Sequence, residues 1–342
     1  MRKIRVLIVD DSILFREILA RGISKDSAIE VVGTASDPYS ARDKIIELNP
    51  DVMTLDVEMP RMNGIEFLRR LMPQYPIPVV VVSSITENVF DAMRAGAVDF
   101  VSKPTSSNKN GMGALINELV VKIKIASAAK VSHWKSSYIP RKSLRDTCSK
   151  SSNKVIAIGA STGGTEAISS ILKVLPKDMP GIVIVQHMPP VFTKMYAQRL
   201  NGSCLLEIKE AQSGDIVCMG RVLIAPGDYH MRLKKSEGNY IVECRKGPRV
   251  SGHCPSVDVL FNSVAENAGR NAIGVILTGM GSDGAQGLLA MRKKGARTIG
   301  QDEKSSIIYG MPRVAYENGA VEKQASLGNI PHLIHSILKD RI

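Results

Sequence analysis

The chain has 342 residues, room for two ordinary domains, and its 44% hydrophobic and 23% charged residues are typical of a globular protein rather than a fibrous or disordered one. No apolar run reaches the roughly 18 residues of a membrane-spanning helix, and acidic residues appear already at Asp10. We therefore expect no transmembrane helix, no signal peptide and a cytoplasmic protein.

The net charge of +12 is uneven along the chain. Residues 1–126 hold 16 basic and 16 acidic side chains, residues 127–153 hold 6 and 1, and residues 154–342 hold 23 and 16. A basic half of this kind leaves both nucleic acid and an acidic protein surface open as partners.

The first part of the chain alternates short β-branched runs with amphipathic stretches. The expected strands are 4–9, 29–33, 52–55, 79–82 and 100–101, and the expected helices are 13–24, 37–48, 64–72, 87–95 and 111–125. Repeated strand–helix units of this kind predict a parallel, doubly wound α/β sheet with helices on both faces.

The alternation stops in a basic, serine-rich stretch that contains Trp134, and this composition is typical of a linker. It resumes with expected strands at 155–158, 182–185, 222–225 and 273–277 and helices near 164–174, 190–200, 256–268 and 284–294. We therefore predict a first domain over residues 3–122, a linker over 123–153 and a second α/β domain over 154–342.

Polar side chains follow several strands of the first domain. Asp10 and Asp11 end the first strand, Asp56 the third and Ser83 the fourth, and Lys103 follows the fifth. Because the carboxyl ends of parallel strands share one edge of the sheet, these groups should converge there. Clustered carboxylates suit Mg²⁺, one carboxylate can accept a phosphoryl group, and a lysine and a hydroxyl can hold its oxygens. A single strand-end aspartate is more often a turn residue or helix cap, but five matching positions favour the phosphoryl site.

These residues resemble the response-regulator receiver domain. The pattern consists of Asp10-Asp11, Asp56 with Met59-Pro60 and Gly64, Ser83, and Lys103-Pro104. The resemblance implies a flavodoxin-like fold and phosphorylation of Asp56 by a chemotaxis histidine kinase. It also implies Mg²⁺ at Asp10, Asp11 and Asp56, with a backbone carbonyl near Glu58, and rearrangement of Ser83 and Phe100 on phosphorylation.

The second domain opens with a strand, a glycine-rich turn and a helix. The turn, Gly159-Ala160-Ser161-Thr162-Gly163, fits the short G-x-S-x-G pattern of a nucleophilic serine. Ser161 alone would more often be a helix cap. A dinucleotide site is the other alternative, but the glycine spacing differs, and the next strand ends in Gln186-His187 rather than an acid.

His187 supplies a base at the edge where Ser161 is expected, and Asp283 lies in a glycine-rich loop after a further strand. Serine needs a base, and the base needs a carboxylate on its other nitrogen, so the three predict a catalytic triad. The α/β-hydrolase order would instead pair Asp215, Asp228 or Asp258 with His332 or His335, which lie in a helix-like tail. A metal site from His187, His230 and His253 is disfavoured by their spacing.

Residues 154–342 resemble the catalytic domain of the chemotaxis protein-glutamate methylesterases. The motifs are Gly159–Gly164, Gln186-His187-Met188-Pro189, 225–230, 255–261 and 277–284. The resemblance implies a Rossmann-like esterase fold, a triad of Ser161, His187 and Asp283, and an oxyanion region near Thr162 and Met280.

The resemblance also implies hydrolysis of glutamate γ-methyl esters, and deamidation of glutamines, on the cytoplasmic domains of chemoreceptors during adaptation. No cofactor is expected for the esterase, and no nucleic-acid binding or membrane insertion. The unphosphorylated receiver would cover the active site and phosphorylation would open it. A DNA-binding response regulator would need a helix-turn-helix after the linker, and a pure adaptor would need no triad.

Overall fold

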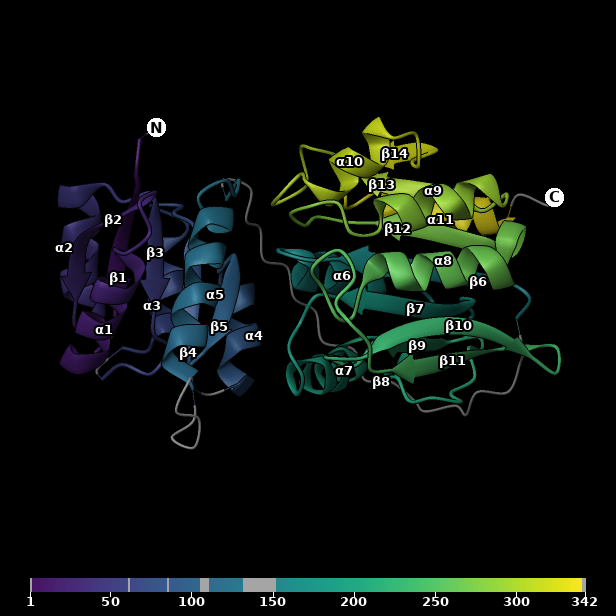
Figure 1. Cartoon of the computed structure of the whole chain (residues 1–342), viewed down its shortest axis with the longest axis horizontal. Coiled ribbons are helices and arrows are strands. Elements are labelled where there is room, and N and C mark those ends of the chain that lie inside the picture. Colours follow the sequence, from purple (N-terminus) through teal and green to yellow (C-terminus); the bar gives the residue numbers. More distant parts are fainter. Residues whose placement is uncertain (1, 61, 85, 105–110, 132–151, 340–342) are drawn as a thin grey trace. The chain divides into compact units, whose positions relative to one another are not determined.

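The computed structural model describes residues 2–60, 62–84, 86–104, 111–131 and 152–339, which form two compact units (Figure 1). Within these residues no helix is both long and apolar enough to cross a membrane. Most of the expected linker, including Trp134, lies outside the described residues.

The first unit contains one five-stranded sheet in the order β2-β1-β3-β4-β5, with every pair of strands parallel. Helices α1 and α5 cover one face, and α2, α3 and α4 cover the other. The strands are β1 Ile4–Val9, β2 Ile29–Ala35, β3 Val52–Leu55, β4 Val79–Ser83 and β5 Asp99–Ser102, and the helices are α1 Ile13–Ile23, α2 Pro38–Leu48, α3 Gly64–Leu71, α4 Thr86–Arg94 and α5 Gly111–Ala126. The doubly wound prediction is confirmed, and α5 continues four residues beyond position 122.

Short polar residues begin α1 and α2 of this unit. Ser12 caps α1 by accepting a hydrogen bond from Phe15 N, and Asp37 caps α2 by accepting from the two N–H groups of Tyr39 and Ser40. These caps satisfy N–H groups that a helix start leaves unpaired.

The second unit contains a seven-stranded parallel sheet in the order β14-β13-β12-β6-β7-β9-β8 and a separate antiparallel hairpin, β10-β11. The strands are β6 Val155–Ala160, β7 Gly181–Gln186, β8 Glu207–Glu210, β9 Arg221–Ile224, β10 His230–Ser236, β11 Asn239–Arg245, β12 Ala272–Ile276, β13 Arg297–Gln301 and β14 Lys323–Ala325. The helices are α6 Gly164–Leu172, α7 Phe192–Ser203, α8 Val257–Asn267, α9 Ala285–Lys293, α10 Met311–Glu317 and α11 Ile330–Lys339, with a 3-10 turn at Gly269–Asn271. Strand order reverses at β6, which β7 and β12 flank, and such a switch point is where open α/β sheets bind ligands.

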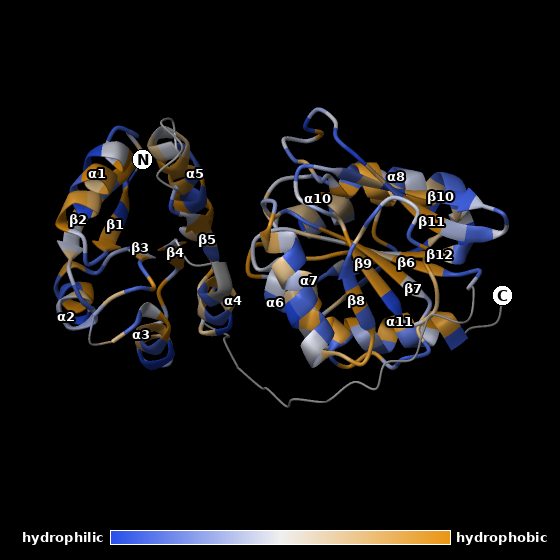
Figure 2. Cartoon of the chain, turned by 90° about the horizontal axis from the view of Figure 1, so that it is seen from below, coloured by the Kyte–Doolittle hydropathy of each residue, from blue (hydrophilic) through white to orange (hydrophobic). Residues whose placement is uncertain are grey.

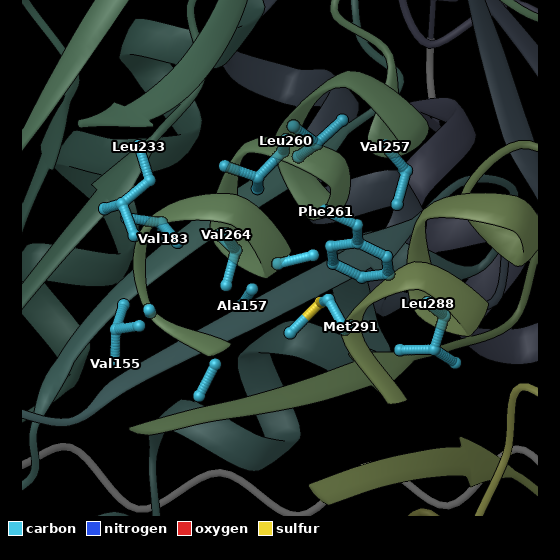
Figure 3. Packing of buried hydrophobic residues seen from close by; sticks show 14 of the residues in the cluster. Val155, Ala157, Val183, Leu233, Val257, Leu260, Phe261, Val264, Leu288 and Met291 are labelled. Carbon is cyan, nitrogen blue, oxygen red and sulfur yellow. The ribbon is translucent and has the colours of Figure 1, made fainter. Parts of the chain in front are cut away.

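The core of the second unit lies between the sheet and helices α8 and α9. Phe261, the largest fully buried side chain, is surrounded by aliphatic residues of the sheet and of both helices (Figure 3). The hairpin covers part of the same face, because β10 turns Met231 and Leu233 inward and leaves Arg232 and Lys234 exposed. Hydrophobic residues concentrate on the strands and on the helix faces turned toward them, and hydrophilic residues lie outside (Figure 2). Helix α8 is therefore fixed firmly against β6, β7 and β12.

Candidate functional sites

Three carboxylates and an ammonium meet at the carboxyl edge of the first sheet. Lys103 Nζ lies 2.8 Å from Asp10 Oδ2 and 2.6 Å from Asp56 Oδ2, with both carboxylates only 2% exposed. One carboxylate oxygen from each of Asp10, Asp11 and Asp56 lies within 4.8 Å of the other two. Among the described residues, no other set of three or more Asp, Glu, His or Cys side chains has a spacing that could hold a metal ion. Carboxylate oxygens at this spacing fit Mg²⁺.

The charges at this edge shift one another's protonation. Burial raises the pKa of Asp56, and the hydrogen bond from Lys103 offsets only part of that effect. Burial alone would lower the pKa of Lys103, but hydrogen bonds to Asp10 and Asp56 outweigh it and raise that pKa. A cation bound beside Asp56 would favour its ionised, nucleophilic form.

The remaining predicted residues of this edge are also in place. Ser83 and Phe100 are buried, and Lys103 N donates to Ser83 O at 2.9 Å. Gly64 is required by close approach, because a β-carbon there would lie 2.3 Å from the Asp56 carbonyl oxygen. The sequence prediction that these strand ends converge is therefore matched by the geometry.

Ser161 and His187 follow the ends of the neighbouring strands β6 and β7. The strands are in register with Ala160 opposite Gln186, so Ser161 and His187 are the next residue on each. The buried side chain of Gln186 links the backbone after β6 to the backbone after β7, because it donates hydrogen bonds to Ser161 O at 2.9 Å and to His187 O at 3.3 Å. On the other side of β6, a β-carbon at Gly279 would lie 2.7 Å from Ser161 Cβ, so only glycine fits there.

His187 bonds Asp283 through Nε2, with 2.8 Å between Nε2 and Oδ2. Burial would raise the pKa of Asp283, but the hydrogen bond and charge of His187, with backbone N–H donors, outweigh it and lower that pKa. An ionised carboxylate only accepts hydrogen bonds, so Nε2 carries the proton and Nδ1 is left as the acceptor. Nδ1 is buried and has no hydrogen-bond partner within the described part of the chain.

Asp283 lies at the first turn of α8 and accepts from three more donors. Oδ1 accepts from Ser256 Oγ at 2.8 Å and Asp258 N at 2.9 Å, and Oδ2 accepts from Val257 N at 2.8 Å. The unpaired N–H groups and the dipole of a helix start favour a negative charge there. The carboxylate that orients His187 is thus held by a helix fixed in the core.

Two further histidines support this arrangement and were not predicted as site residues. The ring of His253 stacks on His187 with centroids 3.6 Å apart and planes 8° from parallel. His230 is buried, has Pro248 O within hydrogen-bonding distance of Nε2 at 2.8 Å, and accepts at Nδ1 from Ser256 N at 3.3 Å. The motifs at 225–230 and 255–261 contain His230 and Ser256, but nothing in their spacing indicates these bonds.

The expected oxyanion region lies beside Ser161. Thr162 is buried, and its carbonyl accepts from Thr278 Oγ1 at 3.0 Å. Met280 follows Gly279, its side chain is 49% exposed, and its backbone N–H makes no hydrogen bond to any described residue. An unpaired N–H next to a nucleophile suits a developing oxyanion.

The alternative constellations are not assembled. His332 and His335 are exposed on α11, while Asp215 pairs with Lys209 at 2.8 Å and Asp258 accepts from Gly287 N at 2.7 Å. Since Asp283 is the carboxylate bonded to the strand-end histidine, the order Ser–His–Asp fits this unit.

Comparison with known proteins matches the two units of the structure to two different family models. The family model described as CheB methylesterase matches residues 156–334, and the model of the response regulator receiver domain matches residues 6–110. The chain belongs to the CheB methylesterase family. A protein-glutamate methylesterase/protein-glutamine glutaminase of Syntrophomonas wolfei is 62% identical over 99% of this chain and 98% of its own length. A relative of the same name from Syntrophotalea carbinolica is 57% identical over 99% of each chain.

A solved CheB structure resembles the second unit. The Thermotoga maritima CheB methylesterase catalytic domain covers 54% of this chain and 99% of its own, with 38% identity and a TM-score of 0.53. The α/β fold predicted for both halves is confirmed. Ser161, His187 and Asp283 lie within the range matched by the CheB methylesterase model.

Proposed function

We propose that Ser161, His187 and Asp283 hydrolyse γ-methyl esters of glutamates, and deamidate glutamines, on chemoreceptor cytoplasmic domains. The relatives' shared name, protein-glutamate methylesterase/protein-glutamine glutaminase, gives the substrate class. The observation that carries the proposal is the Nε2–Asp283 bond, which leaves Nδ1 of His187 unpaired among the described residues, on a residue that follows the strand next to the one that bears Ser161.

The reaction follows from these atoms. Ser161 Oγ bonds to the ester carbon while its proton moves to His187 Nδ1, and the N–H of Met280, with the Thr162 turn, holds the oxyanion. The bond from carbon to the methoxy oxygen then breaks, and Nδ1 returns the proton so that methanol leaves. Water attacks the acyl-serine by the same route and releases the glutamate carboxylate. With a glutamine substrate the leaving group is ammonia.

The first unit supplies control through Asp56. A phosphoryl group from a chemotaxis histidine kinase would transfer to Asp56, with Mg²⁺ held by Asp10, Asp11 and Asp56 and with Lys103 and Ser83 at the phosphoryl oxygens. The ion supplies positive charge against the phosphoryl oxygens when it is bound. With a histidine kinase and the cytoplasmic domains of chemoreceptors as partners, the protein would act in the cytoplasm, and phosphorylation would raise its esterase activity.

The test is release of methanol from methylated chemoreceptor membranes, with and without acetyl phosphate. We expect release that acetyl phosphate and Mg²⁺ increase and that Ser161→Ala abolishes. Equal release by Ser161→Ala would overturn the serine-esterase mechanism.

A further inference from the structure

Two exposed cations, Lys246 and Arg249, lie on the segment between β11 and α8, and neither forms an ion pair with a described residue. Lys246 Nζ lies 5.5 Å from the ring centroid of Tyr229. Over residues 230–249 the chain has six basic side chains and two acidic ones. The basic excess of the second half is therefore concentrated in one short stretch.

This segment is held close to the catalytic histidine. His230 Nε2 lies 2.8 Å from Pro248 O, and Val250 and His253 exchange two backbone hydrogen bonds of 3.0 and 2.9 Å. His253 in turn stacks on His187. Burial, His187 and then the charge of Arg249 lower the pKa of His253 to about 4, with Asp283 opposing them. Arg249 is thus near enough to act electrostatically on the ring beside the base.

Lys246 and Arg249 are opposite in charge to a segment rich in carboxylates, so such a segment bound there would form ion pairs with them beside the catalytic histidine. Charged surfaces of opposite sign also speed encounter and fix register.

We infer that Lys246 and Arg249 form a docking surface for an acidic polypeptide segment that flanks the reacting glutamate. The inference rests on the proposed function, because a segment with several demethylated glutamates is itself acidic. Positive charge would then select esters that lie within acidic sequences.

The test compares Lys246→Glu/Arg249→Glu with Lys234→Glu/Lys235→Glu in the full chain. The control pair is exposed on β10, changes the net charge equally, and lies roughly 13–16 Å along the strand from His230. Substrates are a soluble, methylated cytoplasmic fragment of a chemoreceptor, which excludes lipid effects, and p-nitrophenyl acetate as a small neutral ester.

For Lys246→Glu/Arg249→Glu we expect the ratio of kcat/KM on the receptor fragment to kcat/KM on the small ester to fall about tenfold or more, mainly through KM. In the wild type, kcat/KM on the receptor fragment should fall as the salt concentration rises from about 50 to about 200 mM. This fall should be smaller in Lys246→Glu/Arg249→Glu, whereas the control should keep both the wild-type ratio and the wild-type salt dependence.

An unchanged ratio, or an equal loss in the control, would overturn the docking surface. If a short DNA duplex inhibits cleavage of the receptor fragment at DNA concentrations near the fragment's own KM, the two cations would be assigned to nucleic-acid binding instead. Wild-type protein that cleaves the small ester but not the receptor fragment would overturn the proposed function itself, which is a separate readout.

Discussion

His187 faces Asp283 with Nε2 at 2.8 Å, the reverse of the serine-protease arrangement in which the carboxylate binds Nδ1 and Nε2 faces the serine. The backbone ties His187 to the strand that carries Ser161. His187 is the first residue after β7, and its N–H donates to Ala160 O at 3.2 Å. The distal nitrogen, Nε2, reaches Asp283, and the nitrogen nearer the backbone, Nδ1, is the one left without a hydrogen-bond partner among the described residues.

The three groups act as a unit, so their variants should differ in a predictable way. Ser161→Ala and His187→Ala should lower turnover on methylated receptors about 10⁶-fold, and Asp283→Asn about 10⁴-fold. An asparagine amide at this position would donate a hydrogen bond to Nε2 of His187. The ring proton would then sit on Nδ1, which is the nitrogen that must accept the serine proton. Steady-state methanol release measures this order, and turnover by Asp283→Asn equal to wild type would contradict the assigned tautomer.

Ser256→Ala should weaken both stability and catalysis, because Ser256 caps α8 and donates to Asp283. We expect the free energy of unfolding to fall by about 1–2 kcal/mol and turnover by about 10–100-fold. Ser263→Ala is the matched control on the same helix, since the hydroxyl of Ser263 accepts from Leu233 N at 2.8 Å and donates to Leu260 O at 2.6 Å. Denaturant unfolding and ester turnover should show comparable destabilisation in both variants and a catalytic loss in Ser256→Ala alone.

The stability of the second unit should depend on pH through His253. Its folded pKa of about 4 lies below the unfolded value of 6.5, so the unfolded chain binds more protons between these values. Stability is therefore complete above pH 6.5 and falls as the pH drops toward 4, by about 1–2 kcal/mol because the ring is partly exposed. His253→Phe keeps a flat ring on His187 but cannot titrate. Urea unfolding from pH 4 to 7 should give a flatter profile for His253→Phe, and parallel profiles would refute the effect.

Asp56→Asn should abolish phosphoryl incorporation from a phosphorylated kinase while leaving circular dichroism and unfolding unchanged. The reason is that Asp56 stands alone after β3, whereas Asp10 and Asp11 are adjacent after β1, and Lys103 contacts both Asp56 and Asp10. Incorporation measured with labelled phosphate at the wild-type level would move the acceptor to another residue.

Regulation by cover makes a further prediction about residues 153–342. This part has its own buried core and should fold alone. If the receiver covers the active site, the fragment should turn over methylated receptors faster than the unphosphorylated full chain, and acetyl phosphate should bring the full chain toward the fragment. A fragment no faster than the unphosphorylated full chain would rule cover out.

The sequence predicted the residues that follow central strands and missed those that act through loops. Ser161 and His187 were predictable because buried β-branched runs locate strand ends, and parallel strands share one edge. His230 and His253 were not, because their roles depend on how the hairpin β10-β11 folds back over α8. The hairpin itself was missed because β10 alternates apolar and basic residues over a short span and pairs outside the main sheet. The edge strands β8 and β14 are short and largely polar, which removes the apolar signal that marks central strands.

The position of β6 between β7 and β12 has a consequence for how the enzyme can be switched. The serine, its base and the loop that carries the carboxylate follow three adjacent strands that share hydrogen bonds along their length. Because the three strands are hydrogen-bonded to one another, a displacement of one strand end moves the other two with it. The positions of the catalytic groups relative to one another therefore change little. Signals arriving from elsewhere in the chain should therefore change how readily a polypeptide reaches Ser161, leaving the chemical step on a small ester nearly the same before and after phosphorylation.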